Sequence, residues 1–363
     1  MLLKLRQGNR YLQANPPRLA LDIAGQPATL ARVMQYQTGA GRVSLFEAAR
    51  LIRAAPRAVI IGMGASLNAS IPFENLLCAN GKDALVVEAG ELFHYRGSVY
   101  QEAVFVVVSR SGESVEIARW LAANAGRAPV IGVTNVPDST LARQATVVLD
   151  VHSLLDEMVA IQTYSATLVT LYLLGMTTLN RFDDGCREVE ALLPEFAQLI
   201  VASLAALHDW DNFLEPQTPV YTLGRGPSFG SALQGALLFG EVAKSPAVGM
   251  PVASFRHGPI EVVDHCFKAL LLTPHGPTRL LNLALAADIV RFGGSVRLIG
   301  PPADQRTAAP WIATPRCSDM LAPLVEVVPL QLAAMRLAEL RGIPVGRFRF
   351  TPQVTVDEGT ITT

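Results

Sequence analysis

The stretch AVFVVVSRSGES, residues 103–114, joins a run of six apolar residues to a short segment of serines and a glycine. The apolar run is typical of a buried strand, and the residues after Ser114 have the pattern of an amphipathic helix. The first turn of a helix presents unpaired backbone N–H groups at its positive end, and serine hydroxyls add short donors. The stretch therefore predicts a loop that binds a phosphorylated small molecule without a metal or a lysine.

Length and charge narrow the class of protein. The chain has 363 residues, enough for two domains that each bury a core. Half of the residues are hydrophobic and 17% are charged, which favours buried strands covered by helices. The formal net charge of −1 gives no broad basic surface, so neither nucleic acid nor a membrane is expected as a partner. Phosphate binding must therefore come from local geometry.

Cysteine usage and the N-terminus favour a cytoplasmic protein. The four cysteines are scattered without metal-ligand spacing, which predicts buried, reduced thiols. Residues 1–7 lack the apolar core of a signal peptide. The most apolar long segment, 158–176, contains several polar side chains and is interpreted as a buried helix instead of a membrane span.

Short apolar runs alternate with helical patterns in both halves of the chain. This alternation predicts an α/β fold, with parallel strands flanked by helices on both faces. The expected strands are 58–62, 84–88, 103–109, 129–133, 146–149, 219–223, 268–273 and 295–299. The expected helices are 66–80, 114–126, 157–180, 186–208, 228–243, 277–292 and 323–341.

Two stretches about half the chain apart resemble each other. Residues 59–70 (VIIGMGASLNAS) and 220–231 (VYTLGRGPSFGS) both read as a strand, Gly-x-Gly-x-Ser and a helix. A duplicated domain is the simplest explanation. The predicted organisation is an N-terminal extension (1–45, helical in part after Pro27), a first domain (46–185), a linking helix (186–215) and a second domain with a C-terminal tail (216–363).

The first Gly-x-Gly loop strengthens the predicted phosphate site. In an open parallel sheet, ligands bind at the carboxyl ends of the strands where the winding reverses, so two neighbouring loops converge there. Serine hydroxyls would ring the phosphate, backbone N–H groups of the first loop would assist, and an arginine would add a charge-assisted contact. The candidate residues are Gly64, Ala65, Ser66, Ser109, Arg110, Ser111 and Ser114. The alternative, that these serines only cap helices, stays open.

Further motifs connect the chain with a known family. They are SRSGES at 109–114, GRGPS at 224–228, ALQGAL at 232–237 with Glu241, HGP at 257–259, Asp22-Ile23 with Gln26-Pro27, PLQL at 329–332 and VTV at 354–356. With these motifs the chain resembles double sugar-isomerase (SIS) domain proteins, such as the isomerase half of glutamine–fructose-6-phosphate aminotransferase, phosphosugar isomerases and SIS-type glucosamine-6-phosphate deaminases. The resemblance implies two tandem flavodoxin-like SIS domains, a homodimer, a phosphosugar ligand and no metal or organic cofactor.

The resemblance also implies two catalytic residues. Glu241 matches the base that moves a proton between C1 and C2 of the open-chain sugar, and its apolar neighbours favour partial desolvation. His257 matches the histidine that opens the sugar ring and reaches into the neighbouring subunit's site; an imidazole can both accept and donate a proton near neutral pH. A solvated glutamate and a structural histidine are the alternatives. His152, His265 and His275 are weaker candidates.

Some family positions are changed in this chain. The aminotransferase makes ammonia with an N-terminal cysteine in a separate glutaminase domain; residue 2 is Leu2 here, so we expect no glutaminase activity. The Schiff-base lysine falls at Pro352 or Gln353, and Lys244 is a conceivable substitute. Three further family positions are changed: Ala160-Ile161-Gln162 stands for Ser-Thr-Lys, Gln234 for a glutamate and Leu238 for a lysine.

Three functions fit these observations. The leading hypothesis is an aldose–ketose isomerase acting on a hexose or amino-hexose phosphate through an enediol or enolamine, which needs no Schiff base. The first alternative is glucosamine-6-phosphate deamination. The second is a non-catalytic phosphosugar-binding regulator, which would need neither Glu241 nor His257.

Overall fold

The structure is a computed structural model that describes residues 16–96, 100, 102–156, 158–215, 218–303, 307–345, 347–350 and 354–357. The chain divides into two compact units. The first-sheet unit consists of residues 28–190 and 348–363, and the second-sheet unit of residues 1–27 and 191–347. Two of the divisions fall inside helices, α3 (Arg18–Thr38) and α10 (Phe182–Ala205).

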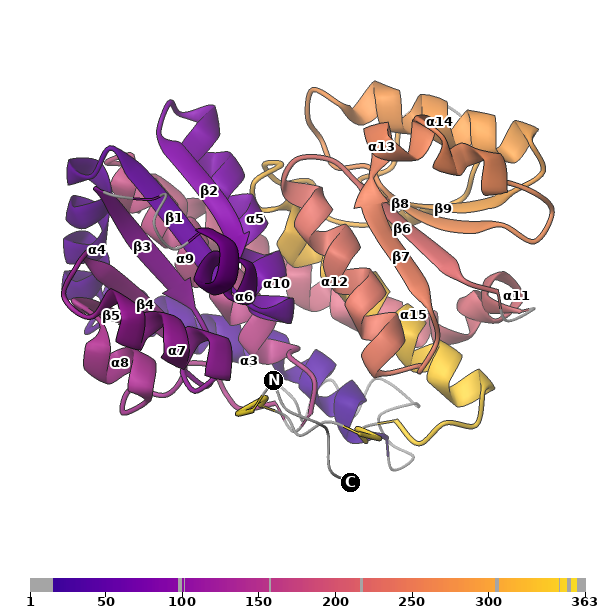
Figure 1. Cartoon of the computed structure of the whole chain (residues 1–363). Helices are drawn as coiled ribbons and strands as arrows, with labels where there is room; N and C mark the ends of the chain where they lie inside the picture. Colours follow the sequence, from indigo (N-terminus) through magenta and orange to yellow (C-terminus); the bar gives the residue numbers. More distant parts are fainter. Residues whose placement is uncertain are drawn as a thin grey trace. The chain divides into compact units, whose positions relative to one another are not determined.

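The first-sheet unit contains five parallel strands (Figure 1). They are β1 (Arg57–Gly62), β2 (Asp83–Glu88), β3 (Ala103–Val108), β4 (Val130–Thr134) and β5 (Val147–Asp150). Their order, β2-β1-β3-β4-β5, is that of flavodoxin-like folds, with the winding reversed between β1 and β3. The predicted strands agree with these bounds to within one residue, because each is a short apolar run between polar or turn residues.

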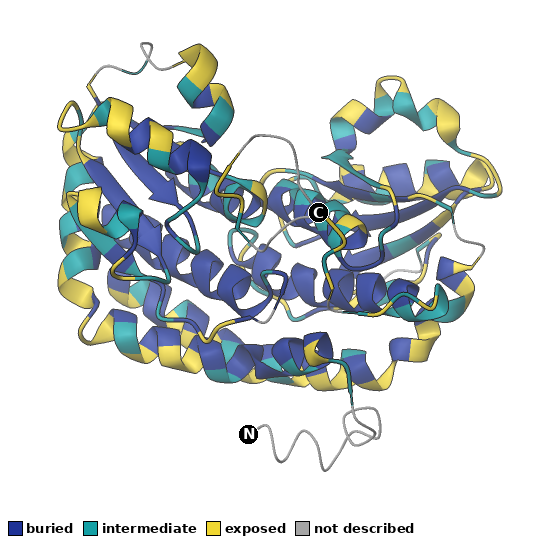
Figure 2. Cartoon of the chain, turned by 60° about the horizontal axis from the view of Figure 1, so that its bottom comes forward, coloured by how far each residue is buried: buried dark blue, intermediate teal, exposed yellow. Residues whose placement is uncertain are grey.

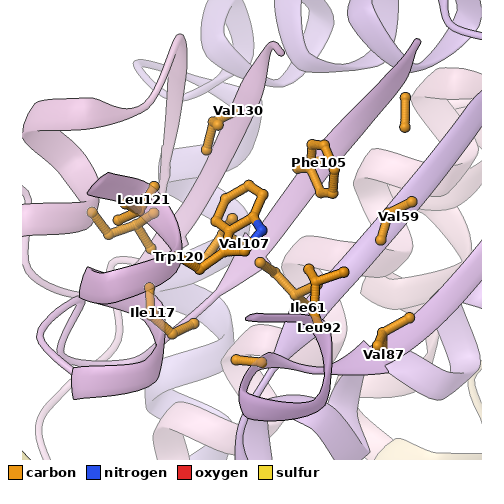
Figure 3. Packing of buried hydrophobic residues seen from close by; sticks show 13 residues of the cluster. Val59, Ile61, Val87, Leu92, Phe105, Val107, Ile117, Trp120, Leu121 and Val130 are labelled. Carbon is orange, nitrogen blue, oxygen red and sulfur yellow. The ribbon is translucent and has the colours of Figure 1, made fainter. Parts of the chain in front are cut away.

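Apolar residues cover both faces of this sheet. All six residues of β3 are buried. On one face, helix α7 (Val115–Asn124) packs Ile117, Trp120 and Leu121 against Phe105 and Val107 (Figure 3). The rings of Phe105 and Trp120 have their centroids 4.6 Å apart. Truncating a buried tryptophan of this kind typically costs about 3–5 kcal/mol, so this cluster holds α7 firmly on the sheet, directly after residues 109–114.

Helix α9 (Gln162–Thr178) is the buried helix expected from the sequence. Every one of its residues is buried, and it packs against α5 (Gly64–Ala79) and α4 (Arg42–Ala54). In the described part of the chain, no single helix has the length and hydropathy of a membrane span. By length and composition alone, the bent pair 182–205 and 207–214 meets that test together, with 68° between its helices.

The second-sheet unit repeats the first topology. Its parallel strands are β6 (Val220–Gly224), β7 (Ala247–Pro251), β8 (Lys268–Leu272), β9 (Ser295–Gly300) and β10 (Trp311–Ala313). Their order is β7-β6-β8-β9-β10. In both sheets, the first strand in the sequence lies between the second and the third, and the fourth and fifth follow. The predicted tandem α/β fold is thus confirmed. The sequence missed β7 and β10, since β7 is a half-buried edge strand with Gly249 and Pro251 and β10 has three residues.

The helices of this unit frame its sheet, and Figure 2 shows the strands buried beneath partly exposed helices. They include α12 (Pro227–Glu241), α13 (Val252–Arg256), α14 (Arg279–Arg291) and α15 (Ala322–Leu340). Helix α12 packs against α15 as α5 packs against α9. Shorter elements of the chain are α6 (Ala89–Glu91), η1 (Leu92–Arg96), α8 (Thr140–Gln144), η2 (Leu207–Trp210), α11 (Asp211–Leu214) and η3 (Pro259–Val262).

Two helix boundaries correct the sequence expectations. Helix α3 begins at Arg18 and continues through Pro27, where the sequence predicted helix only after that proline. Helix α12 ends at Glu241, two residues before the predicted end, and Lys244 lies beyond it with φ +51°. Lys244 is therefore not on the same helix as Glu241.

Candidate functional site

The serine loop, residues 109–114, follows β3 at the carboxyl edge of the first sheet. Ser109 is buried, and its Oγ accepts a hydrogen bond from the Gly112 N–H at 3.1 Å. The Ser111 Oγ accepts from the Glu113 N–H at 3.2 Å. Ser114 precedes α7 but makes no side-chain capping bond. A hydroxyl that accepts still has its own hydrogen to donate, and neither Ser109 nor Ser111 donates it within the described part of the chain.

Gly112 gives this loop its turn. Its φ is +67°, and a Cβ built there would lie 2.1 Å from the Ser139 Oγ. Only glycine meets both demands, because other residues are strained at this φ and bring a Cβ into occupied space. The Gly112 carbonyl also accepts a hydrogen bond from the Leu141 N–H at 3.1 Å.

Glu113 connects the serine loop to α8, the helix between β4 and β5. Its carboxylate accepts hydrogen bonds from the Thr140 N–H at 2.6 Å and the Thr140 hydroxyl at 2.8 Å. These two donors, helped by the charge of Arg143, hold the pKa of Glu113 below its ordinary value. The Arg110 carbonyl accepts from the Asn135 N–H at 3.0 Å and the Thr134 hydroxyl at 3.2 Å. The loop backbone is thus fixed from β4 and α8, while the Arg110 side chain is partly exposed.

The first glycine loop, residues 62–66, leaves the neighbouring strand. Gly62 pairs with Val108 in the sheet, so this loop and the serine loop start side by side where the winding reverses. Gly64 is exposed with φ +48°, and Ala65 and Ser66 are half-buried in the first turn of α5. All seven predicted binding residues therefore lie in two adjacent loops of one unit.

Glu241 and His257 belong to the second-sheet unit. Glu241 is half-buried at the end of α12, between buried Phe239 and buried Val242. The Lys244 ammonium donates to the Glu241 carbonyl oxygen. His257 is exposed just after α13, and its N–H donates to the Ser254 carbonyl at 3.1 Å. Gly258 follows with φ +128°, so the turn and not a helix face presents the histidine.

The changed family positions have structural roles of their own. Gln234 and Leu238 are buried on α12. Gln162 begins α9 and accepts a hydrogen bond from the Thr29 hydroxyl at 2.6 Å. The buried Asp156 carboxylate accepts the N–H groups of residues 161–163 and so caps that helix. Pro352 and Gln353 lie outside the described residues.

The weaker histidine candidates have other neighbours. The His152 ring stacks on Tyr36 at 4.2 Å, and its Nδ1 lies 3.2 Å from the Asp150 carboxylate. His265 stands between Asp264 and Cys266, and the three possible ligand atoms lie within 4.8 Å of one another. This trio is a candidate metal group that the sequence analysis missed. It precedes β8, at the amino ends of the strands and away from the ligand-binding edge.

Sequence analysis also missed a buried carboxylate. Glu326 of α15 is 1% exposed and accepts hydrogen bonds from the hydroxyls of Ser228 at 2.7 Å and Ser231 at 2.8 Å. Burial raises its pKa to about 7, against the opposing effect of the two serine hydrogen bonds. The signal in the sequence was a single acidic residue inside the apolar run LVEVV, residues 324–328.

The two sheets and the hydroxyl-lined loop at a switch point define a doubly wound α/β protein with tandem domains. Residues 51–177 match the SIS domain family. This match lies within the first-sheet unit, and it confirms the resemblance to SIS-domain proteins that was seen in the sequence.

Similar proteins agree with this assignment. Glutamine–fructose-6-phosphate aminotransferase of Pyrococcus horikoshii is 28% identical over 308 residues, covering 81% of this chain and 50% of the relative. The chain thus spans about half the length of this curated relative. The C-terminal domain of the Francisella tularensis aminotransferase superposes with a TM-score of 0.81 at 20% identity, covering 92% of this chain and 98% of that one. Tagatose-6-phosphate ketose/aldose isomerase of Escherichia coli superposes with a TM-score of 0.75 at 20% identity, covering 96% of this chain and 98% of that one.

Proposed function

We propose that this chain is an aldose–ketose isomerase acting on a hexose or amino-hexose phosphate. The observation that carries the proposal is the serine loop, where Ser109 and Ser111 accept loop N–H groups and donate their own hydrogens to no described residue, which leaves them for a ligand. Ser66, Ser114 and the N–H groups of Gly64 and Ala65 complete the proposed phosphate site, with Arg110 as a charge-assisted contact.

Proton transfer at the other end of the sugar is assigned to Glu241 and His257. Glu241 removes the proton from C2 of the open-chain aldose and returns it to C1, while a hydroxyl proton passes between O1 and O2. The enediol is the intermediate between these two transfers at carbon, return of the proton to C1 gives the ketose, and no bond to nitrogen is made or broken. His257, supplied by the other subunit of a homodimer, opens the ring by moving a proton between O5 and O1. The proposal includes no metal and no organic cofactor.

Hydrogen exchange at C2 in deuterated water tests this reaction. A panel of hexose and amino-hexose phosphates is incubated with the protein and followed by NMR. We expect deuterium at C2 of one sugar phosphate together with its aldose or ketose partner. Release of ammonia from glucosamine 6-phosphate would instead indicate a deaminase. Sugar phosphates that bind but never exchange would indicate a regulator.

Variants of the two catalytic candidates separate their roles. Glu241→Gln should lower the exchange rate about 10²–10⁴-fold, and His257→Asn should slow turnover of the ring form more than that of the open chain. Glu261→Gln and His208→Asn, at exposed positions, are the matched controls.

Mixing the two inactive variants tests the shared site. If His257 acts in the other subunit's site, randomly mixed dimers should regain about a quarter of wild-type activity, since half are mixed and each has one complete site. If both residues act within one chain, mixing restores nothing.

A further inference from the structure

The duplication allows the two glycine loops to be compared residue by residue. Strands β1 and β6 occupy the same position in the two sheets. When they are aligned, Gly62 and Gly64 correspond to Gly224 and Gly226, and Ser66 corresponds to Ser228. In the first-sheet unit, Ser66 is one of the proposed phosphate ligands. Its counterpart is fully buried, and its hydroxyl donates to the Glu326 carboxylate.

The second hydroxyl that contacts Glu326 is particular to the second repeat. Ser231 occupies the place that Ala69 has in the first repeat. Glu326 comes from α15, the helix that packs on α12 as α9 packs on α5. The α9 segment, residues 162–178, contains no acidic residue. The first repeat therefore lacks both halves of this contact, the carboxylate and the second serine.

Glu326 also lies at the ligand-binding edge of its own sheet. The small space beside it is lined by residues that follow β8, β9 and β10, namely His275, Pro301 and Thr314, and by Cys317. This space does not admit a water molecule. The carboxylate therefore fills the position where, in doubly wound folds, a ligand binds beyond the strand ends.

A buried carboxylate is costly unless charge-assisted donors surround it. Two serine hydroxyls at the start of the 15-residue helix α12 supply such donors, and the positive end of that helix favours a negative charge. These are the features that suit a phosphate.

We propose that the Glu326 carboxyl group occupies the second repeat's counterpart of the phosphate site and excludes ligand phosphate from it. If the serine loop binds a phosphosugar as proposed, each chain then binds one phosphosugar. Only this number depends on the proposed function. Removing the carboxylate should turn the Ser228–Ser231 position into a site for a tetrahedral oxyanion.

Crystals soaked in tungstate, a heavy analogue of phosphate, provide the test. In the wild-type protein we expect no tungstate at Ser228 and Ser231. In Glu326→Ala we expect one tungstate there, and it should disappear again in Glu326→Ala with Ser228→Ala. Glu326→Gln, which keeps the side-chain volume, should exclude tungstate like the wild type.

Calorimetric titration with inorganic phosphate gives the same count in solution. The number of phosphates bound per chain should rise by one from wild type to Glu326→Ala, also when Ser109 and Ser111 are both replaced by alanine. Tungstate at Ser228 in the wild type, or its absence from folded Glu326→Ala, would overturn the proposal.

The experiment does not depend on a single variant. Circular dichroism and thermal melting establish that Glu326→Ala is folded, and Glu326→Ser replaces it if it is not. The wild-type measurement needs no substitution. An empty serine loop in the wild-type crystals would count against the proposed function only, because the Ser228 position is read separately.

Discussion

Glu113 and Thr140 form a two-point contact that joins the serine loop to α8. The Glu113 carboxylate accepts from the Thr140 N–H at 2.6 Å and from its hydroxyl at 2.8 Å, although the residues are 27 positions apart. The loop conformation that aims Ser109 and Ser111 therefore depends on a second crossover of the sheet. Under the proposed function, Glu113 is a positioning residue that holds the loop.

Replacing Thr140 should weaken binding of the sugar phosphate. Thr140→Val removes the hydroxyl donor but keeps the backbone donor, so we expect a loss of about 1–2 kcal/mol, roughly tenfold in Kd. Turnover at saturating substrate should change much less. Calorimetric titration and steady-state kinetics measure the two effects. Thr140→Ser keeps the hydroxyl and should bind like wild type; equal affinities of the valine and serine variants would contradict the assigned role.

Gly112→Ala should destabilise the protein more than Gly126→Ala. Both glycines have a left-handed backbone, with φ +67° and +71°, so both substitutions carry a strain of about 1–2 kcal/mol. Of the two, only Gly112 would bring the new Cβ against another residue, Ser139, since no described residue lies within 4 Å of a Cβ at Gly126. Urea unfolding of the two variants measures the difference. Equal losses of stability would mean that the serine loop shifts to accommodate the methyl group without cost.

Glu326 should make the stability depend on pH in an unusual direction. Its pKa is raised from 4.5 to about 7 by folding, so between these values the folded chain holds a proton that the unfolded chain has released. The contribution of this bound proton to the free energy of unfolding is present below pH 4.5 and is lost as the pH rises to about 7. At about 1.4 kcal/mol per pH unit, the loss reaches roughly 3 kcal/mol.

Glu326→Gln isolates this contribution. The difference in unfolding free energy between wild type and the glutamine variant should fall across that pH window and stay level above it. His275 and Cys317 line the same space, so His275→Asn and Cys317→Ser in the same pH series show whether they share the titration. A difference that does not change with pH would place the Glu326 pKa near its ordinary value.

Borohydride reduction in the presence of substrate should leave the chain unmodified. An enediol route forms no imine, and the Lys244 ammonium donates to the Glu241 carbonyl oxygen. Intact-mass spectrometry before and after reduction gives the answer. A mass increase of one sugar phosphate, mapped to Lys244, would instead indicate Schiff-base chemistry and favour the deaminase.

The sequence predicted what local patterns encode. Apolar runs located the strands of the first sheet, and the serine loop with Gly64 identified two loops that the structure brings to one edge. The pairing of Ser228 and Ser231 with Glu326 escaped prediction because it joins residues nearly 100 positions apart. Glu113 stood inside the recognised motif, yet only the structure shows that Thr140 is its partner.

The divisions inside α3 and α10 have a consequence for how the two repeats can be handled. A fragment that ends at residue 27 or begins at residue 191 would stop or start in mid-helix, leaving four backbone groups without partners at each new end. Proteases cleave extended chain, so brief digestion should not separate the repeats at these two points. Gene fusions or circular permutations of this chain are better joined in a surface turn, such as the one at Gly126.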